Sequence, residues 1–183
     1  MIRPIDLINK LYPLEDELKN ILLVHSRSVT RKALDIAEKH PELQLNTQFI
    51  AEAAMLHDIG IGLTNAPGIH CHGDYPYICH GYLGADFLRE AGYPEHALVC
   101  ERHTGAGLSL QDIIKQNLPL PHRDMLPVSM EEQVICFADK FFRASIHTDA
   151  DTMTCDIERK CGTERDIHFN LFGYRVHLYL IGK

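Results

Sequence analysis

Hydrophobic residues recur every three or four positions along much of this chain, the spacing that gathers them on one face of an α-helix. The pattern predicts helices over six stretches, namely residues 14–40, 48–58, 77–91, 95–103, 109–114 and 129–142. The second stretch is hydrophobic on nearly every side, so we expect it to be buried. The pattern therefore predicts an all-α fold.

Capping and helix-breaking residues mark several of the helix ends. Asn46 or Thr47 is suited to begin the second helix, and Gly60 is suited to end it. Ser129, followed three residues later by Glu132, forms the capping-box pattern at the start of the last helix. Residues 59–76 contain four glycines and two prolines, and we therefore expect a loop without regular elements there.

The C-terminal part of the chain has a less regular pattern. Residues 152–161 have helical spacing, whereas the alternation of hydrophobic and polar residues over 174–180 suits a strand equally well. We interpret the extension, residues 151–183, as helical. The length of the chain favours a single domain over residues 1–183.

Composition narrows the classes of function. The formal net charge of −7 argues against a broad nucleic-acid surface, because such binding requires many basic side chains. No hydrophobic run approaches the roughly 18 to 20 residues that span a bilayer, and the start of the chain lacks a signal-peptide pattern. We expect a cytoplasmic protein with no membrane partner, whose six cysteines, none in a C-x-x-C pair, are reduced.

An adjacent pair, His57 and Asp58, lies at the end of the buried helix. A buried carboxylate needs a cation or strong hydrogen bonds. The alternative is that Asp58 only caps a turn while His57 packs in the core. His25 and Asp139 also lie within hydrophobic helical runs. One divalent cation held by two imidazoles and two carboxylates would explain all four residues together.

These residues lie in three segments: VHSRSVTRKALDIAEKH, AAMLHDIG and VICFADKFFRAS. Their order, His25, then His57-Asp58, then Asp139, resembles the HD superfamily of metal-dependent phosphohydrolases over about residues 22–145. The resemblance implies a single compact HD-domain helical bundle with residues 151–183 as an extension. It also implies hydrolysis of a phosphoester by metal-activated water.

Two further histidines match a subgroup of that family. His80 in ICHGYLGADFL and His103 in ERHTGAG resemble ligands of a second metal in HDIG-type members. The resemblance implies one or two divalent ions, of iron, manganese, zinc, nickel or magnesium, with Asp58 as the bridge. Alternatively, His80 is an exposed residue at a helix start and His103 completes a helix end. The remaining histidines are interpreted as solvated, surface or packing residues.

In this interpretation Asp58 and His57 are catalytic, and Lys140 and Arg143 contact a phosphate of the substrate. The substrate is expected to be a small phosphorylated molecule, such as a nucleotide. The pattern leaves its identity and the oligomeric state open. We expect residues 61–76 and 104–128 to line the pocket. Two rival functions are a nucleotide-sensing protein without turnover and a di-iron oxygenase of the same family.

Overall fold

The computed structural model describes residues 2–142, 168–171 and 174–177. Contacts between residues divide the chain into two compact units, Met1–Ile146 and His147–Lys183, and each is described by itself. A single domain over the whole length of the chain remains a prediction.

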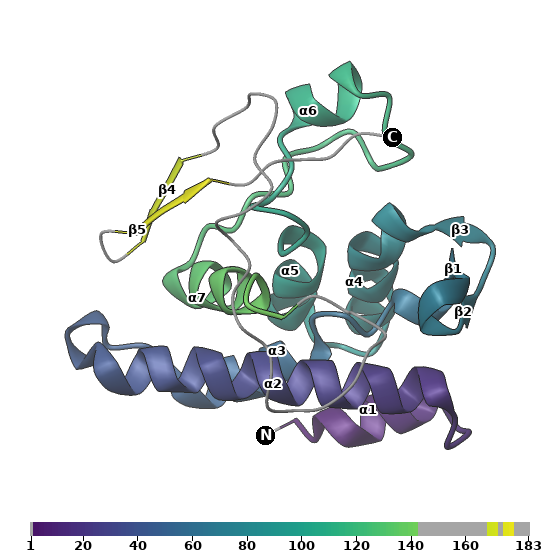
Figure 1. Ribbon diagram of the computed structural model, residues 1–183, viewed down its shortest axis with the longest axis horizontal. Coiled ribbons are helices and arrows are strands. Elements are labelled where there is room, and N and C mark those ends of the chain that lie inside the picture. The colour runs from purple at the N-terminus through teal and green to yellow at the C-terminus, as the bar shows by residue number, and fades with distance from the viewer. Residues whose placement is uncertain (1, 143–167, 172–173, 178–183) are drawn as a thin grey trace. The chain divides into compact units, whose positions relative to one another are not determined.

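The first unit is mainly helical, which confirms the predicted fold class. Its α-helices are α1 (Pro4–Leu11), α2 (Glu17–Lys39), α3 (Thr47–Leu56), α4 (His80–Glu90), α5 (Pro94–Arg102), α6 (Leu110–Lys115) and α7 (Met130–Asp139) (Figure 1). The sequence analysis missed α1, which begins with a proline in its first turn. The last helix ends at Asp139, earlier than the pattern predicted. No described helix is both long enough and hydrophobic enough to cross a membrane.

Side-chain caps fix the starts of α3 and α7, two of the helices that position proposed ligands. Asn46 caps α3, because its side chain accepts a hydrogen bond from the backbone N–H of Phe49. Ser129 caps α7 in the same way, by accepting from Glu132. The Glu132 carboxylate accepts from the backbone N–H of Val128 at 3.0 Å, one residue before the cap. The predicted capping box is therefore only half formed.

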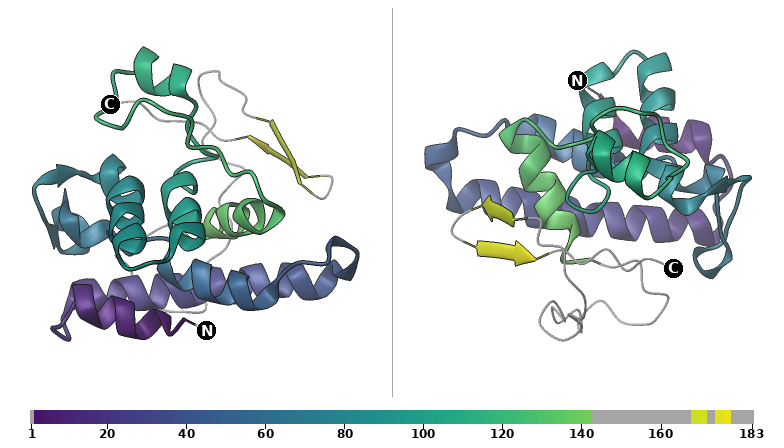
Figure 2. Two further views of the ribbon diagram at one scale, coloured as in Figure 1. Left: turned by 180° about the vertical axis from the view of Figure 1, so that it is seen from behind. Right: turned by 90° about the horizontal axis from the view of Figure 1, so that it is seen from above.

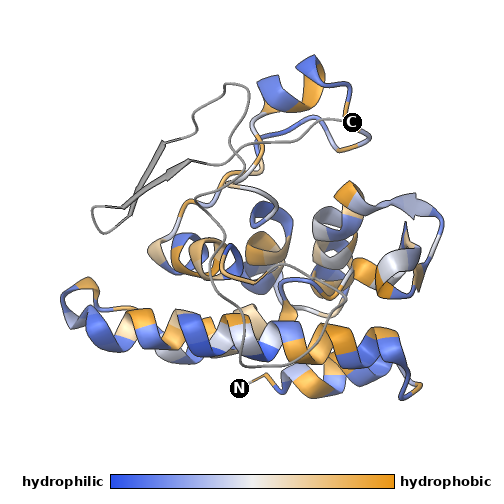
Figure 3. Ribbon diagram, in the orientation of Figure 1, coloured by the Kyte–Doolittle hydropathy of each residue, from blue (hydrophilic) through white to orange (hydrophobic). Residues whose placement is uncertain are grey.

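Packing between helices brings distant parts of the first unit together. The long helix α2 packs against α3 and α7, while α4 packs along α5, as the two views of Figure 2 show. Figure 3 shows hydrophobic and hydrophilic residues interspersed along α2, consistent with one packed face and one solvated face. A fully buried hydrophobic core joins α1, α2, α3 and α4 through Ile8, Leu22, Leu56 and Leu88.

A small three-stranded sheet lies between α3 and α4, where the glycine and proline content predicted no regular element. Strand β1 (Thr64–Ala66) pairs antiparallel with β2 (Cys71–His72) and parallel with β3 (Tyr75–Pro76). That part of the prediction is wrong. Strands of two or three residues are too short to produce a periodic sequence pattern, and their pairing depends on turns between them.

In the second unit, the described residues form an antiparallel pair of strands. Strand β4 (His168–Leu171) pairs with β5 (Tyr174–His177), and His168 lies opposite His177. The helical interpretation of the extension is therefore wrong at these positions, and at 174–177 the alternation indicates the strand that is found. Residues 152–161, the other candidate helix, lie outside the described residues.

Candidate metal centre

The turn after α3 carries His57 and Asp58 into the interior of the first unit. His57 is fully buried and Asp58 is 7% exposed. Behind the turn, the Tyr12 hydroxyl donates to the carbonyl of Ile59 at 2.6 Å and accepts from the N–H of Gly62 at 2.9 Å. Tyr12 follows α1, so the helix that the sequence analysis missed helps to fix the His-Asp turn.

Glycines allow α4 and α5 to approach this turn closely. A Cβ atom on Gly60 would lie 2.2 Å from the carbonyl oxygen of His80, and one on Gly81 would lie 2.8 Å from the carbonyl oxygen of Cys100. Any side chain at either position would push backbone away from backbone. The two glycines therefore allow His80, on α4, and His103, just after α5, to reach Asp58.

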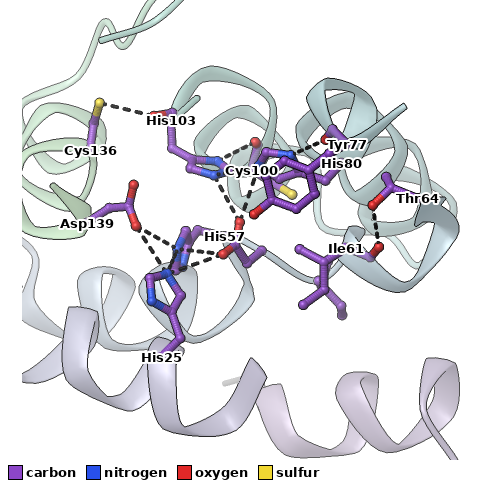
Figure 4. Close-up of polar contacts among 12 residues, drawn as sticks. His25, His57, Ile61, Thr64, Tyr77, His80, Cys100, His103, Cys136 and Asp139 are labelled. Atoms are coloured by element: carbon purple, nitrogen blue, oxygen red, sulfur yellow. Dashed lines mark hydrogen bonds and ion pairs between the residues drawn. The ribbon is translucent and has the colours of Figure 1, made fainter. Parts of the chain in front are cut away.

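Four of the predicted ligands form a first group of metal-binding atoms. His25 Nε2 lies 3.2 Å from His57 Nε2, 3.2 Å from Asp58 Oδ2 and 3.1 Å from Asp139 Oδ1. His57 Nε2 lies 3.6 Å from each of the same two carboxylate oxygens. Figure 4 shows His25, His57 and Asp139 pointing toward one another from α2, the end of α3 and α7.

A second group forms on the other side of Asp58. His103 Nε2 lies 3.1 Å from Asp58 Oδ1 and 3.1 Å from His80 Nε2, and the distance from His80 Nε2 to Asp58 Oδ1 is 3.3 Å. All three side chains are nearly inaccessible to solvent. Asp58 therefore presents one carboxylate oxygen to each group, the placement expected of a bridging ligand.

Backbone carbonyls orient three of the four histidines. His57, His80 and His103 each place Nδ1 2.7 Å from the carbonyl oxygen three residues earlier, in Ala54, Tyr77 and Cys100 respectively. A carbonyl only accepts hydrogen bonds, so each Nδ1 carries the proton and each Nε2 presents a lone pair to the centre. This arrangement is common for histidines that bind metals.

The donor atoms of the two groups suit divalent cations. Ligands about 2.1 Å from a shared ion lie about 3.0 Å apart at right angles and about 3.4 Å apart at tetrahedral angles. The separations of 3.1 to 3.6 Å in the first group and 3.1 to 3.3 Å in the second are close to these values. Lone pairs facing one another at such distances repel unless a cation lies between them. The cluster therefore suggests divalent metal binding.

Burial and neighbouring charges shift the pKa values at the centre strongly. Burial alone would raise the pKa of Asp58 and of Asp139. Electrostatic attraction by His57 together with hydrogen bonds from His103 and His25 outweighs burial for Asp58. For Asp139 the Lys140 ammonium together with hydrogen bonds from His25 and His57 does so, and both pKa values lie well below the usual range. Burial would lower the pKa of His25, but hydrogen bonds to both carboxylates raise it to about 10. Burial lowers the pKa of His80 to about 4, which keeps its imidazole neutral.

Lys140, predicted to contact substrate, is engaged within the centre. Its ammonium donates to Asp139 Oδ2 at 2.7 Å and to the carbonyl oxygen of His103 at 3.2 Å. The Asp139 charge raises the pKa of Lys140 despite its burial. Lys140 thus occupies the outer oxygen of Asp139 and leaves Oδ1 for the first group.

Two arginines near the proposed ligands, Arg27 and Arg102, are directed elsewhere. Arg143 lies outside the described residues, so its predicted role stays a prediction. Arg102 pairs with Glu132 at 3.1 Å, and Arg27 lines an open groove of about 520 Å³ between α2 and α3, away from the centre. No described arginine contacts either group of ligands.

A pocket of about 190 Å³ opens onto the centre. Its wall includes Tyr77, Thr104, Gly105 and Phe142 in addition to five of the six proposed ligands, all except His57. We expected residues 61–76 and 104–128 to line the pocket. Thr104 and Gly105 confirm this for the second segment, whereas none of residues 61–76 is among the described wall residues. The sequence analysis missed Tyr77 and Phe142. Tyr77 stands three residues before His80. In all three oriented histidines, the carbonyl that accepts from Nδ1 lies three residues earlier, so this spacing points to Tyr77.

Histidines outside the family pattern have other surroundings. His96 packs between Phe49 and Tyr93 and lies 3.3 Å from a Glu52 carboxylate oxygen, which confirms a packing role. His72 and His122 are exposed, consistent with their interpretation as surface residues.

Comparison with known proteins gives the family. An uncharacterized protein of Methanocaldococcus jannaschii is 32% identical over 152 residues, which cover 79% of this chain and 82% of that protein. Two proteins named tRNA (cytidine(56)-2'-O)-methyltransferase, from Thermoplasma volcanium and Picrophilus torridus, are 32% and 30% identical over 66% of this chain. The matching region spans only 31% of either methyltransferase. No solved structure matches the chain.

The family model described as HD domain matches residues 22–144, the region in which the sequence resemblance was found. This region contains all six side chains of the two ligand groups. The chain belongs to the HD domain family.

Proposed function

We propose that this protein is a metal-dependent phosphohydrolase with a two-cation centre. The observation that carries the proposal is the position of Asp58, whose two oxygens lie 3.2 Å from His25 Nε2 and 3.1 Å from His103 Nε2, in different ligand groups. Paired cations bound here would neutralise charge on a phosphoryl group and lower the pKa of a water nucleophile.

The ligand chemistry narrows the choice of metal. Four imidazoles and two carboxylates favour iron, manganese, zinc or nickel over magnesium, which prefers oxygen ligands. In this proposal His25, His57, Asp58 and Asp139 hold the first ion, while Asp58, His80 and His103 hold the second.

The chain's own residues would orient the reacting groups. Asp58 would bind both cations, one through each oxygen, and Lys140 holds Asp139 in a single orientation through its outer oxygen. His57, whose Nδ1 donates to the carbonyl of Ala54, would bind the first cation through Nε2. In hydrolysis, the water oxygen bonds to phosphorus, the ester P–O bond breaks, and a proton passes to the departing oxygen.

The pocket supports a small phosphorylated substrate. Its volume of about 190 Å³ is below the roughly 300 to 1,000 Å³ of pockets that enclose drug-sized ligands. A phosphoryl group fits inside, and the remainder of a nucleotide would extend beyond the described wall. The methyltransferase activity in the names of two relatives is not carried over, because the match spans only 31% of those proteins.

The test combines metal analysis with a panel of phosphoesters. We expect the purified full chain to contain up to two transition-metal ions and to release phosphate or a phosphomonoester in the presence of manganese or iron. The Asp58→Ala variant should lose both metal and activity. Full metal content and full activity in that variant would refute the proposed centre.

The same preparation distinguishes the rival functions. Tight nucleotide binding by the metal-loaded protein, without product formation, would indicate a sensor. Consumption of molecular oxygen by the iron-loaded protein would indicate an oxygenase. Hydrolysis of a phosphoester without oxygen consumption would support the proposal against both.

A further inference from the structure

Tyr77 contacts the second ligand group in two ways. It begins a short 3-10 helix, Tyr77–Cys79, that leads directly into α4. Its backbone carbonyl accepts the Nδ1–H of His80 at 2.7 Å. Its ring stacks on the His80 imidazole, with 4.7 Å between ring centroids and 27° between the planes. The position of the Tyr77 ring is therefore tied to a proposed metal ligand.

The ring of Tyr77 also forms part of the pocket wall, beside Asp58 and His103, and Figure 4 shows it extending toward the ligand cluster. Among the residues that the structure describes, its hydroxyl has no hydrogen-bond partner. Tyr12 provides the contrast, because its hydroxyl both donates and accepts in holding the His-Asp turn. The Tyr77 hydroxyl is therefore available to a molecule in the pocket.

The charged groups and the oriented imidazoles of the pocket cannot take that role, which leaves the hydroxyls of Tyr77 and Thr104, and only Tyr77 is also stacked on a proposed ligand. Ionised Asp58 and Asp139 only accept hydrogen bonds, and the Nε2 atoms of the oriented histidines present lone pairs. The nearby ammonium of Lys140 is already bound to Asp139 and to the carbonyl of His103. A phosphoryl group in the pocket has non-bridging oxygens that face away from the cations, and these oxygens need a donor.

We propose that the Tyr77 hydroxyl donates a hydrogen bond to a non-bridging oxygen of the phosphoryl group that undergoes hydrolysis. This inference rests on the proposed function and names a substrate-binding residue for it. A hydroxyl fixed by ring stacking requires little reorganisation, and a hydrogen bond to an anionic oxygen is stronger than one to a neutral acceptor. The class of ligand recognised is a phosphate monoester or free phosphate.

The test uses the full chain loaded with manganese. Tyr77→Phe removes only the hydroxyl and keeps both the ring that stacks on His80 and the backbone carbonyl. Tyr75→Phe is the matched control, since Tyr75 is exposed on β3 and is not part of the pocket wall. Calorimetry measures the affinity for inorganic phosphate, and steady-state kinetics measure kcat and KM for p-nitrophenyl phosphate.

We expect Tyr77→Phe to weaken phosphate binding and to lower kcat/KM roughly tenfold or more, with unchanged manganese content and melting temperature. Tyr75→Phe should match the wild type in every measurement. Phosphate affinity within twofold of the wild type in Tyr77→Phe would overturn the inference. Loss of manganese from Tyr77→Phe would also overturn it, because the residue would then act only by positioning His80.

The two proposals fail in different ways. A manganese-loaded wild type that hydrolyses no phosphoester would contradict the proposed function, while the effect of Tyr77→Phe on phosphate binding would still be measurable. A wild type that hydrolyses phosphoesters, with an equally active Tyr77→Phe variant, would contradict the role of Tyr77 alone.

Discussion

Two clusters of buried charge lie close together in the sequence at the end of α5, and they differ in how their charges are compensated. Glu101 is 4% exposed, and its two oxygens bind the guanidinium groups of Arg89 and Arg123. His103, two residues later, faces Asp58 and His80, where nitrogen lone pairs and carboxylate oxygens point at one another. The first cluster is complete within the chain, whereas a cation would complete the second.

This difference separates a structural ion network from a metal centre. A buried carboxylate that meets two guanidiniums has its charge and its hydrogen-bonding capacity satisfied. A carboxylate that faces the lone pairs of oriented imidazoles receives no hydrogen bond from them. It is stabilised only when a cation binds between these groups. The count of hydrogen-bond donors and acceptors in a buried cluster therefore indicates better than its burial whether the cluster is an ion network or a site for a cation. The following changes should affect the two clusters in opposite ways.

The largest effect is expected for Asp58→Asn. The amide has nearly the same shape but supplies one weak acceptor in place of a bridging carboxylate, so metal content should fall and activity should drop at least a hundredfold. A chelator should lower the melting temperature of the wild type and leave that of the variant unchanged. Asp74→Asn, at an exposed position, should behave as the wild type in both mass spectrometry and thermal melting. A chelator-sensitive Asp58→Asn variant would show that the bridge is elsewhere.

The opposite result is expected for Glu101→Gln. Two arginines would lose their shared carboxylate, and because both are partly exposed we expect a loss of about 2 to 3 kcal/mol in the free energy of unfolding. Metal content should be unchanged. Denaturant unfolding measures the first quantity, with Glu90→Gln as the exposed control on α4. If Glu101→Gln lost metal while its free energy of unfolding stayed unchanged, the two clusters would not differ in the way described.

A smaller effect is expected where α4 meets the His-Asp turn. A Cβ atom on Gly84 would lie 2.7 Å from Cys100 Sγ and 2.8 Å from Gly60 N, so Gly84→Ala should displace α4 and cost about 1 to 3 kcal/mol. It should also weaken binding of the second ion through His80. Gly92→Ala is the control, because its Cβ would meet nothing within 4 Å and its cost of about 1 kcal/mol comes from a φ of +88°. Metal titrations that fail to separate these two variants would contradict the proposed role of close packing.

Counted per pH unit, the smallest effect is expected from pH. In the metal-free protein the pKa of His25 is raised from 6.5 to about 10, so its imidazole holds a proton at neutral pH. Stability from this protonated histidine is complete below pH 6.5 and is lost as the pH rises toward 10. A metal ion must displace the proton, so apparent metal affinity should rise up to about tenfold per pH unit over this window. Calorimetry in buffers of different ionisation enthalpy should detect the released proton, and a flat profile would contradict this coupling.

Local sequence patterns were sufficient for much of the fold and for the candidate ligands. The boundaries of α2, α4 and α5 follow from hydrophobic spacing and from breakers such as Pro41 and Gly92, which act over one or two turns. Patterns failed where an element was very short, as in β1 to β3. They also failed in the extension, where the helical interpretation gave way to β4 and β5.

Sequence by itself singled out the six side chains proposed as metal ligands, because residue type and order can be compared without knowledge of contacts. Only the tertiary structure decided how those groups are used. It assigned one oxygen of Asp58 to each ligand group, placed Lys140 on Asp139, and directed Arg102 to Glu132. These choices depend on the close approach of helices at glycines and on carbonyls that orient imidazoles. Contacts of that kind join residues far apart in the chain, which a linear pattern does not encode.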